Sequence, residues 1–150
     1  MEESIIKTTT KRGHLMVKVI FGIFIVLHGI VHLIYSGHSF RLFKIQPGLE
    51  WPDGSWALSF FLKNDNVRII AGIFCIIAFI GFILGSIGIF SNSIWWRPVV
   101  IGTAIFSTIA LLLLWDGLMQ KLPEKGAIAI IINLAIIAFV LIVQRLNFKL

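Results

Sequence analysis

The sequence is poor in charged residues: Asp, Glu, Lys and Arg make up 13% of its 150 residues, whereas 58% are hydrophobic. A soluble domain carries about a quarter charged residues, which cover its surface. The composition, with a mean hydropathy of +0.97, therefore excludes an ordinary soluble domain and predicts an integral membrane protein. The length allows one domain at most, so we expect residues 1–150 to form a single membrane domain.

The sequence also has only one cysteine, Cys75, which lies inside an apolar run. One cysteine cannot form an internal disulfide, nor the cysteine pair that a thiol–disulfide relay needs. The net charge is +6, but Lys and Arg lie at the ends of apolar runs rather than on one face. This distribution is typical of membrane flanks and argues against a nucleic-acid partner.

Four apolar segments are long enough to cross a hydrocarbon core of roughly 30 Å as helices. They cover about residues 16–35, 67–90, 98–115 and 126–143. Backbone groups inside a bilayer have to be hydrogen bonded within their own segment, which favours α-helices. The sequence therefore predicts an all-α membrane protein, a bundle of four transmembrane helices. Before the third span, the Trp95–Trp96 pair is typical of an interfacial anchor, and Pro98 suits a first helical turn.

The orientation follows from the basic residues before the first span, which are Lys7, Lys11, Arg12 and Lys18. Positive charge favours the cytoplasmic side, and four spans return the chain to the side where it started. No small-x-small cleavage site follows the first apolar run, so we expect an uncleaved helix. The prediction is a multi-pass protein of the cell membrane with both termini in the cytoplasm.

The longest connection, about residues 36–66, is too apolar for an ordinary solvated loop. Within EWPDGSWALSFFLKND, Asp53–Gly54 suits a turn and Ser55 suits a helix cap. We expect an interfacial first loop or short helix, with residues 56–62 lying along the membrane surface. Two interpretations stay open: a connector that follows the membrane, or a lid over whatever lies beneath it.

Polar residues gather in the half of the bundle next to this loop: His28, His32, Tyr35, Arg68, Asp116 and Asn133. The first three share one helical face, and the others reach a similar depth when residues are counted from the ends of their spans. Charged and polar groups inside spans are costly and are usually paired or functional. We expect a ligand-binding polar pocket in this outer half, with a structural hydrogen-bond network as the alternative.

The opposite half carries small residues at similar depth: Gly22, Gly81, Gly85, Gly88 and Gly102. Gly81 and Gly85 have the GxxxG spacing that lets helix backbones approach closely in lipid. We expect these glycines to pack helices together, either within the chain or across a homodimer. Ser107 and Thr108, in the middle of the third span, are interpreted as helix-packing or back-bonding residues.

Three functional classes remain open. A binding or accessory component of the membrane, holding a lipidic or small-molecule ligand in the outer pocket, makes the fewest assumptions. A membrane-embedded enzyme would use a histidine oriented by Asp116 as its acid–base group, with Arg68 holding an anionic group of the substrate. Alternatively, it would bind a metal ion through His28, His32 and Asp116, because the HxxxH spacing places two imidazoles on one helical face. A small transporter would have to act as a dimer, and no span has the mid-depth proline typical of carriers. The pattern names no cofactor.

Several short motifs occur together: HGIVH in the first span, GSW before the second, WWRP at the third and WDG after it. With these motifs the chain resembles a group of small, uncharacterised prokaryotic four-span proteins. The resemblance implies a four-helix membrane bundle, broadly similar in architecture to DoxX-type proteins. The group has no established activity, so the resemblance implies no catalytic residue and no cofactor.

Overall fold

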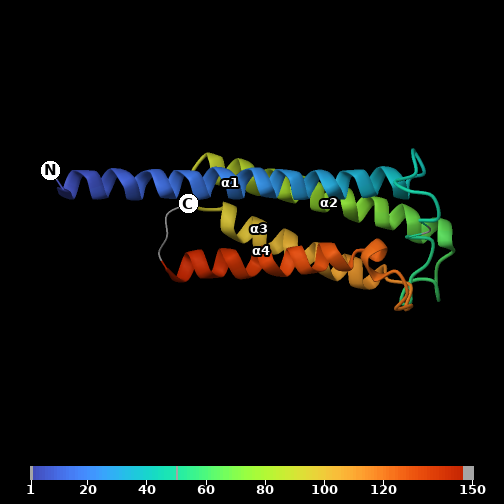
Figure 1. Ribbon diagram of the computed structural model, residues 1–150. Helices are drawn as coiled ribbons and strands as arrows, with labels where there is room; N and C mark the ends of the chain where they lie inside the picture. The colour runs from blue at the N-terminus through green and yellow to red at the C-terminus, as the bar shows by residue number, and fades with distance from the viewer. Residues whose placement is uncertain (1, 50, 147–150) are drawn as a thin grey trace.

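The computed structural model describes residues 2–49 and 51–146. Over these residues it consists of α1 (Glu2–Ser39), α2 (Asn64–Phe90), α3 (Trp96–Leu113), a short 3₁₀ helix η1 (Leu122–Lys125) and α4 (Ala127–Arg145). The four α-helices run alternately in opposite directions (Figure 1). Each contains a segment long and apolar enough to cross a membrane. The structure thus confirms the predicted fold class, an all-α bundle of four transmembrane helices.

The helix boundaries differ most from the sequence prediction in α1. It begins at Glu2 and not near residue 16, because the polar segment before the first span is helical as well. The part of α1 that is apolar enough to span a membrane covers Arg12–Ser39. The first turns extend beyond the other helices (Figure 1).

The two ends of the bundle differ in their connections (Figure 1). One end, here called the loop end, carries loop 1 (residues 40–63) and the segment between α3 and α4 (residues 114–126). The other, here called the terminal end, carries the short turn between α2 and α3, the start of α1 and the end of α4. The six polar residues singled out above all lie in the half of the molecule that adjoins the loop end or in its connections.

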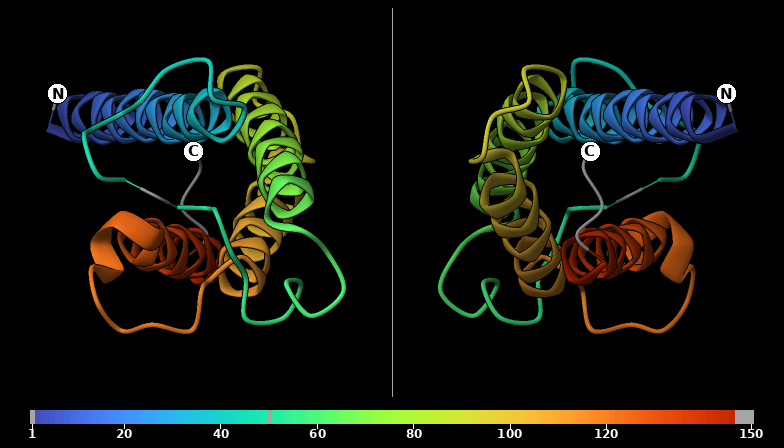
Figure 2. Two further views of the ribbon diagram at one scale, coloured as in Figure 1. Left: turned by 90° about the vertical axis from the view of Figure 1, so that its right-hand side faces the viewer. Right: turned by 90° about the vertical axis from the view of Figure 1, so that its left-hand side faces the viewer.

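Each helix packs against the next one along the chain. Figure 2 shows α2 and α3 on one side of the bundle and α1 and α4 facing each other across the other side. Two serines tie α1 to α2: Ser36 Oγ donates to the carbonyl of Gly72 at 3.0 Å, and Ser86 Oγ donates to that of Gly22 at 3.0 Å. These bonds fix the first two helices at both ends of their contact.

The predicted glycine packing holds at most positions. A Cβ on Gly85 would lie 2.5 Å from Val100 Cγ2, and one on Gly88 would lie 2.7 Å from Trp96 Cβ. Gly81 lies similarly close to a side chain of α3, and Gly22 to the ring of Phe90. The glycines of α2 therefore let α3 of the same chain approach, and this face is occupied within the monomer.

Gly102 does not belong to this packing set. A Cβ at Gly102 would meet no heavy atom within 4 Å. The residue lies at the depth that the sequence indicates, but on a face of α3 that no described neighbour covers. Counting residues along a helix gives depth and does not give the direction of a side chain.

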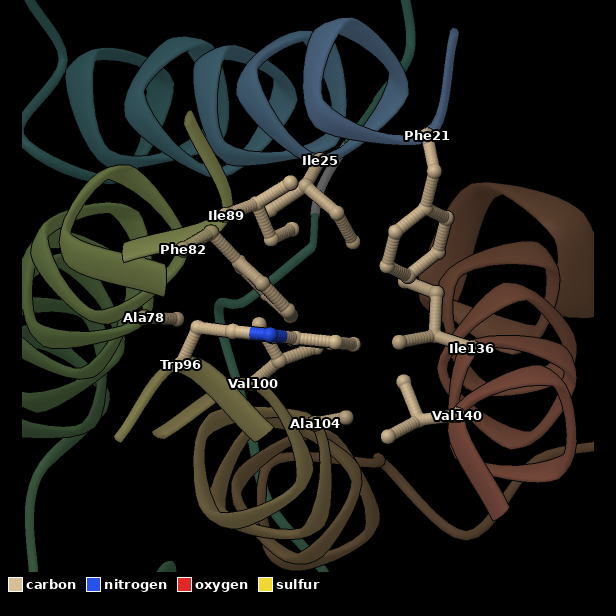
Figure 3. Close-up of a cluster of buried hydrophobic side chains, with 10 residues drawn as sticks. All are labelled: Phe21, Ile25, Ala78, Phe82, Ile89, Trp96, Val100, Ala104, Ile136 and Val140. Atoms are coloured by element: carbon tan, nitrogen blue, oxygen red, sulfur yellow. The ribbon is translucent and has the colours of Figure 1, made fainter. Parts of the chain in front are cut away.

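Apolar side chains from all four helices meet in the terminal half of the bundle, as Figure 3 shows. Trp96 lies at the centre of this cluster and is 3% exposed. The prediction that Trp95 and Trp96 together anchor the protein at the interface is therefore wrong for Trp96, although Trp95 is 41% exposed. Between α1 and α4, the rings of Phe21 and Phe139 lie 4.6 Å apart and close this half of the bundle.

Residues 56–62 of loop 1 form turns and not the short helix that was one of the two expectations. Ser55 does act as a local cap: its Oγ accepts hydrogen bonds from the backbone N–H groups of Ala57 and Leu58. Phe60 and Phe61 are 86% and 81% exposed. Exposed aromatic side chains at the end of a transmembrane bundle suit the membrane–water interface. Glu50, part of the same stretch, lies outside the described residues.

Candidate functional site

A buried hydrogen-bond network connects three helices in the half next to the loop end. His28 Nε2 on α1 lies 2.8 Å from Asn133 Oδ1 on α4. Asn133 Nδ2 donates to Ser107 Oγ on α3 at 2.9 Å, and this hydroxyl lies 3.2 Å from His32 Nε2, back on α1. All four side chains are at most 5% exposed.

The proton positions in this network follow from the groups involved. Asn133 Oδ1 can only accept, so His28 carries a proton on Nε2 and donates it. Ser107 Oγ already accepts from Asn133, which leaves the hydroxyl proton for His32 Nε2. The hydrogen bonds then run in one direction around the network, and the Nε2 atoms of both histidines are used in holding helices together.

Aromatic contacts fix the orientation of the two imidazole rings. The ring centroids of His28 and His32 lie 5.0 Å apart with an interplanar angle of 80°. Phe82 on α2 stacks on His32 with a centroid distance of 5.6 Å and meets the edge of His28 at 4.8 Å. All four helices therefore contribute to the environment of the histidine pair.

A cavity of about 150 Å³ lies beside this network, between α1 and α4. The residues that define it are His28, His32 and Tyr35 on α1, Ala129 and Ile132 on α4, and Trp51 of loop 1. Cys75 and Leu111 line it from α2 and α3. Val31 and Ile128 on its edge are 42% and 55% exposed. The cavity is therefore largely apolar and opens sideways, toward the region that lipid would occupy.

Trp51 covers the cavity at the loop end. Its side chain is 6% exposed and meets the ring of Tyr35 edge-on at 5.6 Å. Its indole Nε1 is buried, and no hydrogen-bond partner for it exists among the described residues. A buried N–H group without a partner costs free energy, so its presence calls for an explanation.

Loop 1 is held over the bundle by the end of α3. The last carbonyl groups of a helix have no partner within the helix. Trp56 Nε1 donates to the carbonyl of Leu112 at 2.8 Å, Ser55 Oγ donates to that of Leu113, and Trp56 N donates to that of Trp115 at 2.7 Å. The GSW and WDG motifs thus contact each other, and Figure 2 shows loop 1 crossing between α1 and α4.

The two charged residues of the predicted site lie apart from the histidine network. Arg68 Nη1 lies 2.9 Å from a carboxylate oxygen of Asp65 and 3.9 Å from one of Asp53. Asp116 pairs with Lys125 at 2.5 Å. Burial alone would raise the pKa of Asp116, but hydrogen bonds from Lys125 and from the backbone N–H of Leu118 lower it below its ordinary value.

The metal hypothesis required His28, His32 and Asp116 to meet. Within the described part of the chain, no group of three His, Cys, Asp or Glu residues is arranged to hold a metal ion. The carboxylate of Asp116 is paired with a lysine, and the Nε2 atoms of both histidines are hydrogen bonded. The structure brings the two histidines together without the third ligand.

Three residues of this site, Ser107, Cys75 and Trp51, are not among the site residues that the sequence predicts. The sequence indicates packing or back-bonding for Ser107, but this residue connects Asn133 to His32. Thr108 does bond back to the carbonyl of Ala104, as expected. Cys75 and Trp51 line the cavity. The available signal for Ser107 was its depth, about two and a half helical turns before Asp116.

No protein-family model, curated protein or solved structure matches this chain.

Proposed function

We propose that the protein binds a membrane-soluble molecule in the cavity between α1 and α4, with a hydrogen-bond acceptor of that molecule facing the Trp51 indole. The observation that carries this proposal is the buried, unpartnered Nε1–H of Trp51, a residue that borders the cavity. An acceptor such as a carbonyl or ester oxygen would satisfy this donor, whereas a purely aliphatic ligand would leave it unpaired.

The size and lining of the cavity restrict the part of the ligand that it takes. A cavity of about 150 Å³ is as large as one that accommodates a benzene molecule. Its walls are mostly apolar, with aromatic side chains from Tyr35 and Trp51. These features suit a compact, planar or branched head group, and the exposed edge at Val31 and Ile128 leaves room for an attached chain to extend into lipid.

Binding is better supported than proton transfer or metal chemistry. An acid–base catalyst needs a ring nitrogen within reach of its substrate, and the Nε2 atoms of His28 and His32 are already used by Asn133 and Ser107. Asp116, the carboxylate that an enzyme hypothesis would use, is paired with Lys125. The network favours a role in fixing the cavity wall, which a specific binding site requires.

The orientation belongs to the same proposal. The four spans suit a multi-pass membrane protein, and the basic residues before the first span favour an orientation in which the terminal end faces the cytoplasm. Loop 1 and the Trp51 side of the cavity then face the opposite side of the membrane. The ligand would enter from the leaflet on that side.

The test is to identify what the protein carries out of the membrane. Wild-type protein would be purified in detergent and extracted with organic solvent, and the extract analysed by liquid chromatography and mass spectrometry. Ala129→Phe places a ring in the cavity, and Ala135→Phe adds the same ring on an exposed position of α4. Melting temperatures of the three proteins establish that each is folded.

We expect one acceptor-bearing compound enriched with the wild type and with Ala135→Phe, and at least tenfold depleted with Ala129→Phe. Bulk membrane lipid in identical proportions from all three proteins would contradict the proposal. So would a compound that is retained equally when the cavity is filled.

A further inference from the structure

A second hollow also borders Trp51, at the loop end. Its volume is about 380 Å³, and Trp51 is the residue that it shares with the cavity between α1 and α4. The other residues that matter for its chemistry are His38, Arg41, Lys44, Asp53 and Arg68. Loop 1 and the first turns of α2 supply nearly all of this lining.

The charges around this hollow are unequal. Arg41, Lys44 and Arg68 supply three positive charges, and Asp53 supplies one negative charge. Asp53 lies between the two arginines, 3.4 Å from Arg41 Nη2 and 3.9 Å from Arg68 Nη1. Lys44 has no ion-pair partner among the side chains that the structure describes, those of residues 12–49, 51–123 and 125–146. The lining described by the structure therefore has two positive charges in excess.

Arg68 is the fixed element of this group. Its side chain is 16% exposed, and both of its ion pairs, with Asp53 and Asp65, use the same nitrogen, Nη1. The planar guanidinium group carries five N–H donors in a fixed fork, and the two ion pairs hold this plane in place, which suits the oxygens of a phosphate.

We propose that this hollow, beside Trp51, binds a phosphate group through Arg41, Lys44 and Arg68. A phosphate offers several strong acceptor oxygens and one to two negative charges, and the three cationic side chains exceed the carboxylates of Asp53 and Asp65 by one positive charge. Arg68 lies in the first turns of a membrane span, the level at which long basic side chains reach lipid head groups. The phosphate can come from a membrane lipid or from solution, and the experiment separates these sources.

This site is independent of the proposed apolar ligand. Its charged residues lie in loop 1 and α2, whereas the cavity is bounded mainly by α1 and α4. Arg41→Gln combined with Lys44→Gln removes two charges from exposed positions and leaves Arg68 and its ion pairs in place. The matched control is Lys63→Gln combined with Arg145→Gln, which removes the same charge at exposed positions outside the hollow.

The experiment measures binding to purified full-length protein. Dioleoylphosphatidic acid and dioleoylglycerol, which have the same acyl chains with and without a phosphate, are compared by native mass spectrometry. Inorganic phosphate is titrated by calorimetry in a chloride buffer. Ala129→Phe is carried through the same measurements, and we expect it to leave phosphate binding unchanged.

We expect phosphatidic acid to bind to the wild type at least tenfold more tightly than dioleoylglycerol does. Its affinity should fall about tenfold in the Arg41→Gln/Lys44→Gln protein and stay unchanged in the control variant. If inorganic phosphate shows the same dependence on the variant and the lipid does not, the site stands and its phosphate comes from solution. The proposal is overturned if the two lipids bind equally and inorganic phosphate does not bind. It is also overturned if the control variant loses as much affinity as Arg41→Gln/Lys44→Gln.

Discussion

Replacing Asn133 by leucine tests the energetic role of the buried network. The side chain is fully buried, and the change removes the hydrogen bonds to His28 and to Ser107. Hydrogen bonds between transmembrane helices contribute about 0.6 kcal/mol on average and up to about 1.7 kcal/mol. We therefore expect Asn133→Leu to lower the free energy of unfolding by about 1–3 kcal/mol. Leucine has the same number and branching of side-chain heavy atoms as asparagine but is larger, so overpacking adds to the loss of the two bonds.

The assay is unfolding in mixed micelles of a mild detergent and dodecyl sulfate, followed by tryptophan fluorescence, because Trp96 reports on the core. Asn66→Leu, at an exposed position of α2, is the control and should change the midpoint little. A double-mutant cycle with His28→Leu isolates the bond between α1 and α4. A coupling energy near zero, or a variant as stable as the wild type, would refute the assignment of Asn133 to an interhelical network.

Three further predictions concern other parts of the fold. Gly85→Ala should destabilise the protein by about 1–3 kcal/mol because the new methyl group meets Val100 at 2.5 Å. Gly102→Ala should be neutral or stabilising by up to about 1 kcal/mol, because the new methyl group meets no atom. Thermal unfolding measures both effects. Ser55→Ala should loosen the attachment of loop 1 to α3, which Trp56 still maintains, and raise hydrogen exchange in residues 54–58, with unchanged exchange in the helices. The pKa of Asp116 is lowered in the folded state, so its contribution to stability is present above the ordinary carboxyl pKa of about 3.9 and is lost as the pH falls through the lower folded value. The difference in the free energy of unfolding between the wild type and Asp116→Asn should therefore shrink below about pH 4. A difference that stays constant with pH would contradict this.

Depth along the helices could be predicted from the sequence. Counting residues from the ends of the spans placed His28, His32 and Asn133 at one level, and they share one hydrogen-bond network. The same count placed Arg68 and Asp116 at that end of the bundle, but depth does not fix the direction of a side chain or its competing partners. Both charged groups are paired with groups in or next to the connections.

The cover of the cavity could not be predicted in the same way. Helical periodicity carries no information on Trp51, because its position depends on how loop 1 is fastened to α3 through Ser55 and Trp56. The motifs that contain these residues were visible in the sequence, but their contact is tertiary. Trp96 shows the converse: a tryptophan pair at a helix start is typical of an interface, yet the close approach at Gly88 lets this ring enter the core.

The most direct measurement is the ¹H–¹⁵N indole signal of Trp51, assigned with Trp51→Phe, in protein as purified from membranes and after exhaustive delipidation. If a ligand accepts a hydrogen bond from Nε1, the signal shifts when the ligand is removed and returns when the extracted compound is added back. Ala129→Phe, whose cavity is filled, should show the delipidated position throughout. An indole signal of the wild type that is the same before and after delipidation would contradict the proposed binding site.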